Sequence, residues 1–210
     1  MRILVIYRIN TKDPGITGIK SKLDGQVKAF KKSHNVDVIY LTNQSICFND
    51  KPIKQLADNW YSNKLSRLNV FYKLFYKTIQ EEIKLDEYDL IYIRYHAAYH
   101  QFYSFLKSLK AKVVLEMPTY PYDKEFSKWW QRFQLSIDKR YRNKLSTHVS
   151  RMVHFGPHKE IYNIPTFRMT NGISIPEHVV LAEHKHQQPF TMIAIGKWQY
   201  WHGLDRLIKG

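Results

Sequence analysis

Short runs of apolar, often β-branched residues alternate along the chain with longer stretches in which apolar residues recur at helical spacing. Runs of the first kind are typical of strands buried on both faces of a parallel sheet. Six of them predict strands, over Arg2–Tyr7, Val36–Leu41, Asp89–Arg94, Val113–Met117, Val149–Phe155 and Phe167–Thr170. The alternation of strands and helices predicts an α/β layer fold.

The first amphipathic helix is predicted over about residues 18–32. Its apolar stripe consists of Ile19, Leu23, Val27 and Phe30. Gly25 interrupts this helix, although an internal glycine costs on the order of 1 kcal/mol relative to alanine. The glycine indicates either close packing of the helix on the sheet or simple tolerance at an open position.

Two longer helices, over residues 59–82 and 127–145, combine an apolar stripe with many basic residues. The stripes contain Leu65, Leu68, Tyr72, Phe75 and Ile79 in the first, and Trp130, Phe133, Ile137, Tyr141 and Leu145 in the second. Such stripes usually face the core, and we expect that here. The alternative is that both helices press against an anionic membrane surface.

Charge and cysteine content narrow the cellular setting. The 210 residues carry 33 Lys and Arg against 18 Asp and Glu, a formal charge of +15, which favours a nucleic acid, anionic lipid or diphosphate-bearing partner. The single cysteine, Cys47, excludes an internal disulfide and favours a reducing compartment. No apolar run approaches the roughly 20 residues that span a bilayer. We expect a cytoplasmic protein whose membrane contact, if any, is peripheral and at the inner face.

Four motifs follow one another in a recognisable order. They are residues 14–20 with Lys22 through Gln26, then Val114–Asp123, then Met169–Ile173, and finally 195–198 with 201–208. In this order they resemble retaining family 4 glycosyltransferases of the bacterial polysaccharide-building type. The resemblance implies a GT-B fold, in which two Rossmann-like lobes, each a parallel sheet flanked by helices, face one another across a cleft.

The resemblance also implies a domain organisation. Residues 1–173 would form the N-terminal acceptor-side lobe, 174–189 a linker, and 190–210 the beginning of a donor-binding lobe. The paired-glutamate motif of the family has no counterpart in this sequence. The second lobe is therefore expected to be truncated. Alternatively, the N-terminal lobe is expected to work beside a second chain that supplies the donor-binding lobe.

The implied activity is transfer of a hexose from a nucleotide sugar to a polysaccharide or lipid-linked saccharide, without a metal cofactor. The candidate acceptor-binding residues lie in the first loop and at predicted strand ends: Gly15, Gly18, Lys20, Arg94, His96, Glu116, Tyr120 and Tyr122. Ligands of open α/β sheets collect at the carboxyl ends of strands. The alternatives are that Arg94 forms a structural ion pair with Glu116, and that the tyrosines pack in the core.

On the donor side, the candidates surround the start of the last predicted helix. They are Gly196, Lys197, His202 and Gly203. Backbone N–H groups at a helix N-terminus, together with a lysine, can stabilise a diphosphate leaving group as it gains charge. No residue can be assigned as catalytic from the sequence.

Three pairs have spacings that a metal site could use: His96 with His100, His184 with His186, and Asp123 with Glu125. The two histidine pairs lack the third and fourth ligands that zinc demands. The pair of Asp123 and Glu125 departs from the Asp-x-Asp pattern that holds a nucleotide-bound cation. We expect no metal at any of them.

Two other function classes compete with the enzyme. A non-catalytic acceptor-binding or partner module would keep the first lobe without a working donor site. A nucleic-acid-binding protein would explain the charge and the aromatic content, but the sequence lacks a recognition motif, and its basic residues follow helices rather than strands.

Overall fold

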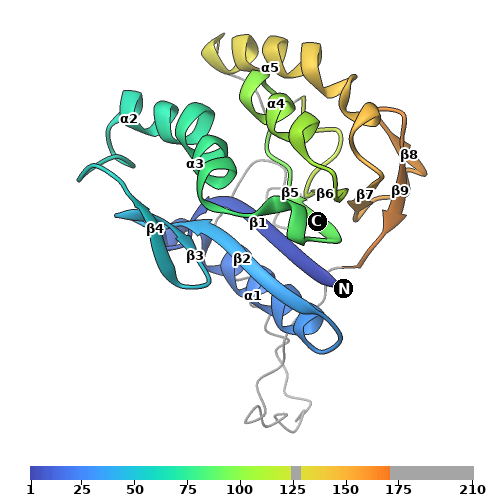
Figure 1. The fold of residues 1–210 in the computed structure, drawn as a ribbon. Coiled ribbons are helices and arrows are strands. Elements are labelled where there is room, and N and C mark those ends of the chain that lie inside the picture. Colours follow the sequence, from blue (N-terminus) through green and yellow to red (C-terminus); the bar gives the residue numbers. More distant parts are fainter. Residues whose placement is uncertain (124–128, 171–210) are drawn as a thin grey trace, which may run out of the picture. The chain divides into compact units, whose positions relative to one another are not determined.

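The computed structural model describes residues 1–123 and 129–170, which form a central sheet covered by helices on both faces (Figure 1). The strand order in this part of the chain is β4-β3-β2-β1-β5-β6-β7-β9-β8. The strands are β1 (Arg2–Asn10), β2 (Asn35–Leu41), β3 (Ser45–Phe48), β4 (Lys51–Gln55), β5 (Leu90–Arg94), β6 (Lys112–Met117), β7 (Arg151–His154), β8 (Glu160–Ile161) and β9 (Ile164–Arg168). The predicted Rossmann-like parallel sheet flanked by helices is confirmed.

The six predicted strands correspond to β1, β2, β5, β6, β7 and β9, and these are the strands that pair in parallel within the described residues. Most of β1 is buried, with Leu4, Val5 and Ile6 fully shielded from solvent. Such strands need apolar residues at successive positions rather than alternating ones. The sequence pattern therefore located the parallel part of the sheet.

An antiparallel hairpin, β3–β4, extends the β2 edge of the sheet and was not predicted. Its turn uses Asn49 and Asp50, both with positive φ, 46° and 67°. Two successive left-handed residues are typical of the tight turns that join antiparallel strands. The outer strand β4 is mostly exposed and contains Pro52, which is tolerated because an edge strand has a free side.

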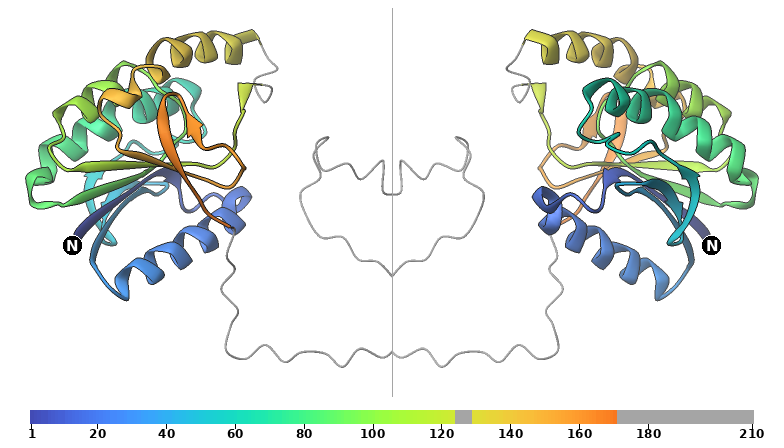
Figure 2. Two further views of the ribbon diagram at one scale, coloured as in Figure 1. Left: turned by 90° about the vertical axis from the view of Figure 1, so that its right-hand side faces the viewer. Right: turned by 90° about the vertical axis from the view of Figure 1, so that its left-hand side faces the viewer.

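The helices form two layers. Figure 1 shows helix α1 (Thr17–Lys31) below the sheet and the other helices above it, and the two rotated views in Figure 2 agree. The upper layer contains α2 (Lys64–Asn69), a π-helical turn (Val70–Leu74), α3 (Phe75–Glu82), α4 (His100–Ser108) and α5 (Trp129–Arg142). Short 3-10 segments lie at Pro14–Ile16, Leu85–Glu87 and Leu145–Thr147. Each helix within the described ranges is too short or too polar to cross a bilayer.

Helix α1 matches its prediction closely. Leu23 is buried, and Val27 and Phe30 pack against the apolar residues on the lower face of the sheet. Ile19, which was expected in the same stripe, is 38% exposed. A side chain at Gly25 would meet no atom within 4 Å, so close packing is not the reason for this glycine. The position is open, and the glycine is tolerated.

The predicted long helix over residues 59–82 is interrupted. Asn63 caps the start of α2, where its side-chain oxygen accepts a hydrogen bond from the Ser66 amide at 3.0 Å. The π turn at Val70–Leu74 then inserts an extra residue and rotates α3 relative to α2. Leu65 is consequently 78% exposed, although Phe75 and Ile79 of the same predicted stripe are fully buried.

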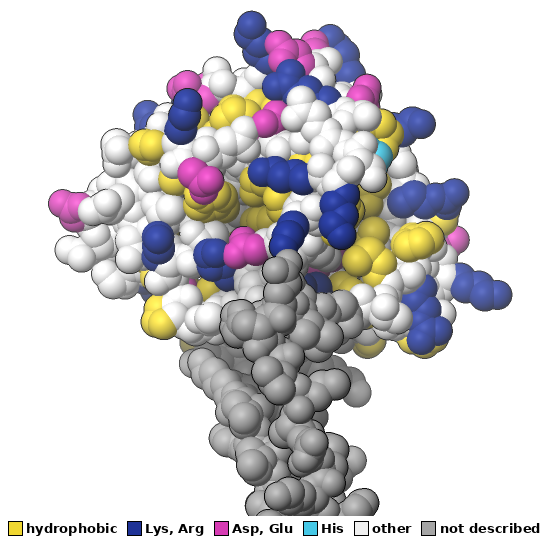
Figure 3. Space-filling view, turned by 90° about the horizontal axis from the view of Figure 1, so that it is seen from below, with side chains coloured by type: hydrophobic (Ala, Val, Ile, Leu, Met, Phe, Trp, Pro, Cys, Tyr) yellow, Lys and Arg dark blue, Asp and Glu magenta, His cyan; other side chains and the backbone are white. Residues whose placement is uncertain are grey.

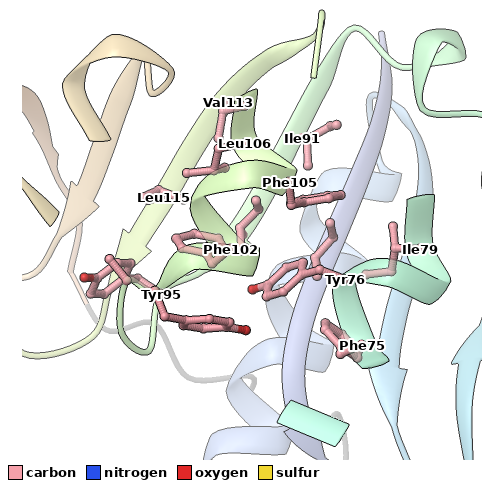
Figure 4. Packing of buried hydrophobic residues seen from close by; sticks show 14 of the residues in the cluster. Phe75, Tyr76, Ile79, Ile91, Tyr95, Phe102, Phe105, Leu106, Val113 and Leu115 are labelled. Atoms are coloured by element: carbon pink, nitrogen blue, oxygen red, sulfur yellow. The ribbon is translucent and has the colours of Figure 1, made fainter. Parts of the chain in front are cut away.

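The main core lies between the upper helices and the sheet (Figure 4). Aromatic side chains of α3 and α4 meet there: Tyr76 lies 5.2 Å from Phe102 and 4.9 Å from Phe105, measured between ring centroids. Ile91 and Leu115 of the sheet lie beneath them and are fully buried. The many tyrosines and phenylalanines of this chain thus serve largely to join helices to the sheet.

Candidate functional site

The order of the parallel strands creates a switch point between β1 and β5. The chain leaves β1 through α1 on the lower face, whereas it leaves β5 through α4 on the upper face. A crevice opens outside the carboxyl ends of two strands where the connections diverge in this way. The loop with Gly15 and Gly18 follows β1, and His96 follows β5. Of the candidates that the sequence predicted, Gly15 and Gly18 lie on one side of the switch point and Arg94 and His96 on the other, whereas Glu116, Tyr120 and Tyr122 belong to β6 and the loop after it.

Glu116 is the centre of a polar cluster on the lower face of the sheet, close to this switch point. Its carboxylate is fully buried and forms an ion pair with the Arg94 guanidinium at 2.5 Å. The two residues are direct partners in the β5–β6 register. From α1, the Lys22 ammonium lies 3.3 Å from the same carboxylate, and the Gln26 amide donates to it at 3.1 Å. Tyr92 donates its hydroxyl proton at 2.8 Å.

The pair of Arg94 and Glu116 is the structural alternative that the sequence left open. Because two cations surround one carboxylate, this cluster retains one positive charge. Arg94 is 8% exposed, whereas the side chain of Lys22 is 22% exposed and lies over the Phe155 ring at 3.7 Å from its centroid. Of the two cations in the cluster, Lys22 is therefore the one that a bound molecule can reach more easily.

Burial shapes the protonation of the groups around Glu116. It lowers the pKa of Lys22, an effect that the charge of Glu116 opposes and that of Arg94 reinforces. Burial also raises the pKa of Tyr92, and the neighbouring carboxylate adds to that increase. Tyr92 consequently remains a proton donor to Glu116 at any physiological pH.

Lys22, Gln26 and Tyr92 were not among the predicted site residues, although Lys22 through Gln26 belonged to the first motif. One signal in the sequence could have found them. Lys22 and Gln26 are four residues apart, so they project from the same side of a helix. Tyr92 and Arg94 are two apart on a strand and share a face of the sheet.

The glycine loop begins with a well-defined cap. The Asp13 side chain accepts a hydrogen bond from the Gly15 amide at 2.8 Å, and the Tyr61 hydroxyl donates to the same carboxylate at 2.5 Å. Gly18 lies in the first turn of α1, and a side chain there would meet no atom within 4 Å. The backbone at Gly18 is thus accessible to an approaching molecule.

Lys20 lies apart from the Glu116 cluster, because it projects from another side of α1. It pairs with Asp24 at 2.5 Å and lines a groove of about 500 Å³ between α1 and the strands β1 and β2. Basic residues Lys12, Lys28 and Lys31 line the same groove. Seen from below, this side of the molecule carries several basic side chains around apolar surface (Figure 3). The Tyr7 hydroxyl, also at the groove, has no hydrogen-bond partner among the described residues.

His96 and His100 do not share a helix face. His100 is the first residue of α4, and His96 lies in the preceding loop with an exposed side chain. Within residues 1–123 and 129–170, no group of three or more potential ligands is placed to hold a metal ion. Asp123 instead pairs with Arg142 at 2.7 Å and with Lys139 at 3.4 Å. His184, His186 and Glu125 lie outside the described residues.

The two tyrosines of the loop after β6 have different environments. Tyr120 is partly buried and packs edge-on against the rings of His158 and Tyr162, at 4.9 and 5.6 Å. Tyr122 is 5% exposed, and its hydroxyl donates to Asp138 at 2.5 Å. Burial raises the pKa of Tyr122 to about 12, with a contribution from Asp138. Tyr122 therefore packs in the core, which is the alternative that the sequence left open for these tyrosines. The ring of Tyr120 remains partly accessible.

The donor-side candidates Gly196, Lys197, His202 and Gly203 lie outside the described residues, as does the predicted linker. Their assignment remains a prediction. The site that the structure describes is the edge of the sheet formed by the glycine loop, Arg94, His96, Lys22 and Glu116.

Comparisons with known proteins reveal similarity to a solved structure but not to a family or to a curated sequence. No protein-family model matches the chain, and no curated protein matches it. Among solved structures, an alpha-glucosyltransferase in complex with UDP and a 13-mer DNA containing a central A:G mismatch is similar at 13% sequence identity, with a TM-score of 0.37. The match covers 80% of this chain and 39% of that enzyme, so the chain spans less than half the enzyme's length.

Proposed function

We propose that this chain is the acceptor-side lobe of a glycosyltransferase that moves a hexose from a nucleotide sugar to a saccharide or lipid-linked acceptor. The observation that carries the proposal is the Lys22–Arg94–Glu116 cluster at the switch point of a parallel sheet, beside the accessible backbone of the glycine loop. The four motifs that resemble family 4 glycosyltransferases support it. A low-similarity structural match adds no argument for the activity.

The chemistry of sugar transfer explains why this arrangement is suitable. The departing diphosphate gains negative charge, which a nearby cation and backbone N–H groups stabilise. Lys22 supplies the accessible positive charge, and Gly18 supplies backbone that can be approached closely. Glu116 is saturated by four donors, so its role is to position Lys22 and Arg94 rather than to take up a proton.

Replacing Lys22 by glutamine should weaken nucleotide binding. We expect submillimolar affinity of the protein for at least one of UDP, GDP and dTDP, and a loss of about tenfold in the K22Q variant, because charge-assisted hydrogen bonds contribute ~1.5–3 kcal/mol. Isothermal titration calorimetry measures both quantities. Lys32→Gln is the matched control, since Lys32 is an exposed residue at the end of the same helix.

Two outcomes would count against the enzyme. If none of the three nucleotides binds while an oligosaccharide mixture does, the chain is a non-catalytic acceptor-binding module. If the K22Q and K32Q variants both bind nucleotide as tightly as the unmodified protein does, the Glu116 cluster is not part of the binding site.

A further inference from the structure

Helix α5 exposes its large apolar side chains instead of burying them. Trp129 is 83% exposed, Phe133 is 68% exposed and Ile137 is 36% exposed. These residues are spaced by four, so they follow one side of the helix. The core position that the sequence predicted for Phe133 and Ile137 is therefore wrong, whereas Leu145, beyond the helix, is fully buried as expected.

The opposite side of α5 explains this orientation, because it is held by polar contacts. Asp138 is fully buried and accepts hydrogen bonds from the Tyr95 hydroxyl and the Ala98 amide, both at 2.6 Å. Arg142 contributes a further contact to Asp138 at 3.3 Å and a pair with Asp123 at 2.7 Å. These bonds fix which face of α5 points inward. The apolar stripe is left exposed to solvent. Helix α5 itself lies at the top of the helix layer in Figure 1.

Basic residues flank the stripe. Arg132 and Arg140 are both exposed. At 3.6 residues per turn, Arg140 falls on the same side as Phe133 and Ile137, whereas Arg132 lies about 100° around the helix from Phe133, at the edge of the stripe. A hollow of about 370 Å³, lined by Ile137, Arg140 and Tyr141 from α5 and by Tyr72 from the π turn, adjoins this face. The surface therefore combines tryptophan, phenylalanine and arginine side chains in one stripe.

We propose that α5 is an interfacial helix that lies flat on an anionic membrane. Tryptophan and phenylalanine insert at the boundary between headgroups and acyl chains, while arginines bind the phosphates. The formal charge of +15 adds long-range attraction to the same surface. The 14 residues of α5 give a contact about 21 Å long, parallel to the membrane plane. This inference stands independently of the proposed function.

Co-sedimentation with vesicles tests the proposal. The unmodified protein should pellet with phosphatidylcholine vesicles that contain phosphatidylglycerol, much less with phosphatidylcholine alone, and progressively less as salt is raised. The double variant Trp129→Ser, Phe133→Ser should lose at least about tenfold in binding, because it removes most of the inserted apolar surface. Phe167→Ser is the matched control, since Phe167 is an aromatic residue of similar exposure, 63%, on β9.

Thermal unfolding verifies that the double variant is folded, which is expected because both replaced side chains are exposed. Equal pelleting of the three proteins, equal binding to both kinds of vesicle, or no binding to either would overturn the proposal. So would a dimer in gel filtration that the double variant converts to a monomer, because the stripe would then contact a second copy.

Discussion

Replacing Glu116 by glutamine is expected to lower the free energy of unfolding by about 3 kcal/mol, since removing one partner of a buried ion pair leaves the other charge uncompensated. Glu116 is fully buried and neutralises the 8% exposed Arg94. Glutamine has almost the same shape but presents an N–H₂ group to a site that already holds four donors. Urea denaturation measures the change as a shift in midpoint at constant slope.

Asp86→Asn is the control for this variant. Asp86 also pairs with a cation, Lys110, at 2.7 Å, but the two side chains are 64% and 78% exposed. Exposed pairs contribute little to stability. An E116Q protein as stable as the D86N protein would mean that the carboxylate of Glu116 does not hold the cluster together.

The second large effect is expected for Asp138→Asn. This carboxylate accepts three hydrogen bonds of 2.6 Å or less, from Tyr95, Ala98 and Tyr122. An asparagine at this position must turn its N–H₂ group toward one of these donors, so that both groups lose their hydrogen-bond partner. Each buried polar group left unsatisfied costs about 1–3 kcal/mol. We expect the free energy of unfolding to fall by about 3 kcal/mol. Backbone amides of α5 should also exchange hydrogen faster, because Asp138 holds that helix in place.

Asp123→Asn serves for comparison, because Asp123 contacts the same Arg142 but keeps 35% of its side chain exposed. The decrease in the free energy of unfolding of the D123N protein should be less than half that of the D138N protein. Unchanged exchange rates in α5 of the D138N protein would contradict the role given to Asp138, whatever the change in global stability.

How far the sequence predicts this fold depends on the kind of contact. Parallel strands such as β1 are buried on both faces, so their residues form a continuous apolar run that a pattern detects. The β3–β4 hairpin lies at an edge and is only partly apolar, and its clearest signal is the turn at Asn49 and Asp50. Helix α4 spans nine residues with Phe102, Phe105 and Leu106 buried, a segment too short for periodicity to decide.

Helix α5 shows the limit of amphipathic patterns. The periodicity of Phe133 and Ile137 predicts that the helix has an apolar side, but it cannot say which side meets the protein. Hydrogen bonds from Tyr95 and Ala98, distant in sequence, decide the question by binding Asp138. Such contacts exist only once the strands are assembled.

The candidate site, like the fold, was predictable only where its contacts follow from the order of the strands. Arg94 is the last residue of β5 and Glu116 the last but one of the adjacent parallel strand β6, so their pairing could be expected from the order of the strands. Lys22 and Gln26 come from the helix beneath, and their approach to Glu116 depends on how α1 crosses the sheet. Tertiary packing, rather than any local pattern, brings them to the carboxylate.

A transfer assay is the sharpest test of the proposal that the edge around Lys22 and Glu116 serves sugar transfer. The protein is incubated with radiolabelled UDP-, GDP- and dTDP-hexoses and a mixture of oligosaccharide and lipid-linked acceptors. We expect label to be incorporated from at least one donor, and the incorporation to fall about tenfold or more in K22Q but not in K32Q. Absence of incorporation from all donors, or equal incorporation by both variants, would contradict it.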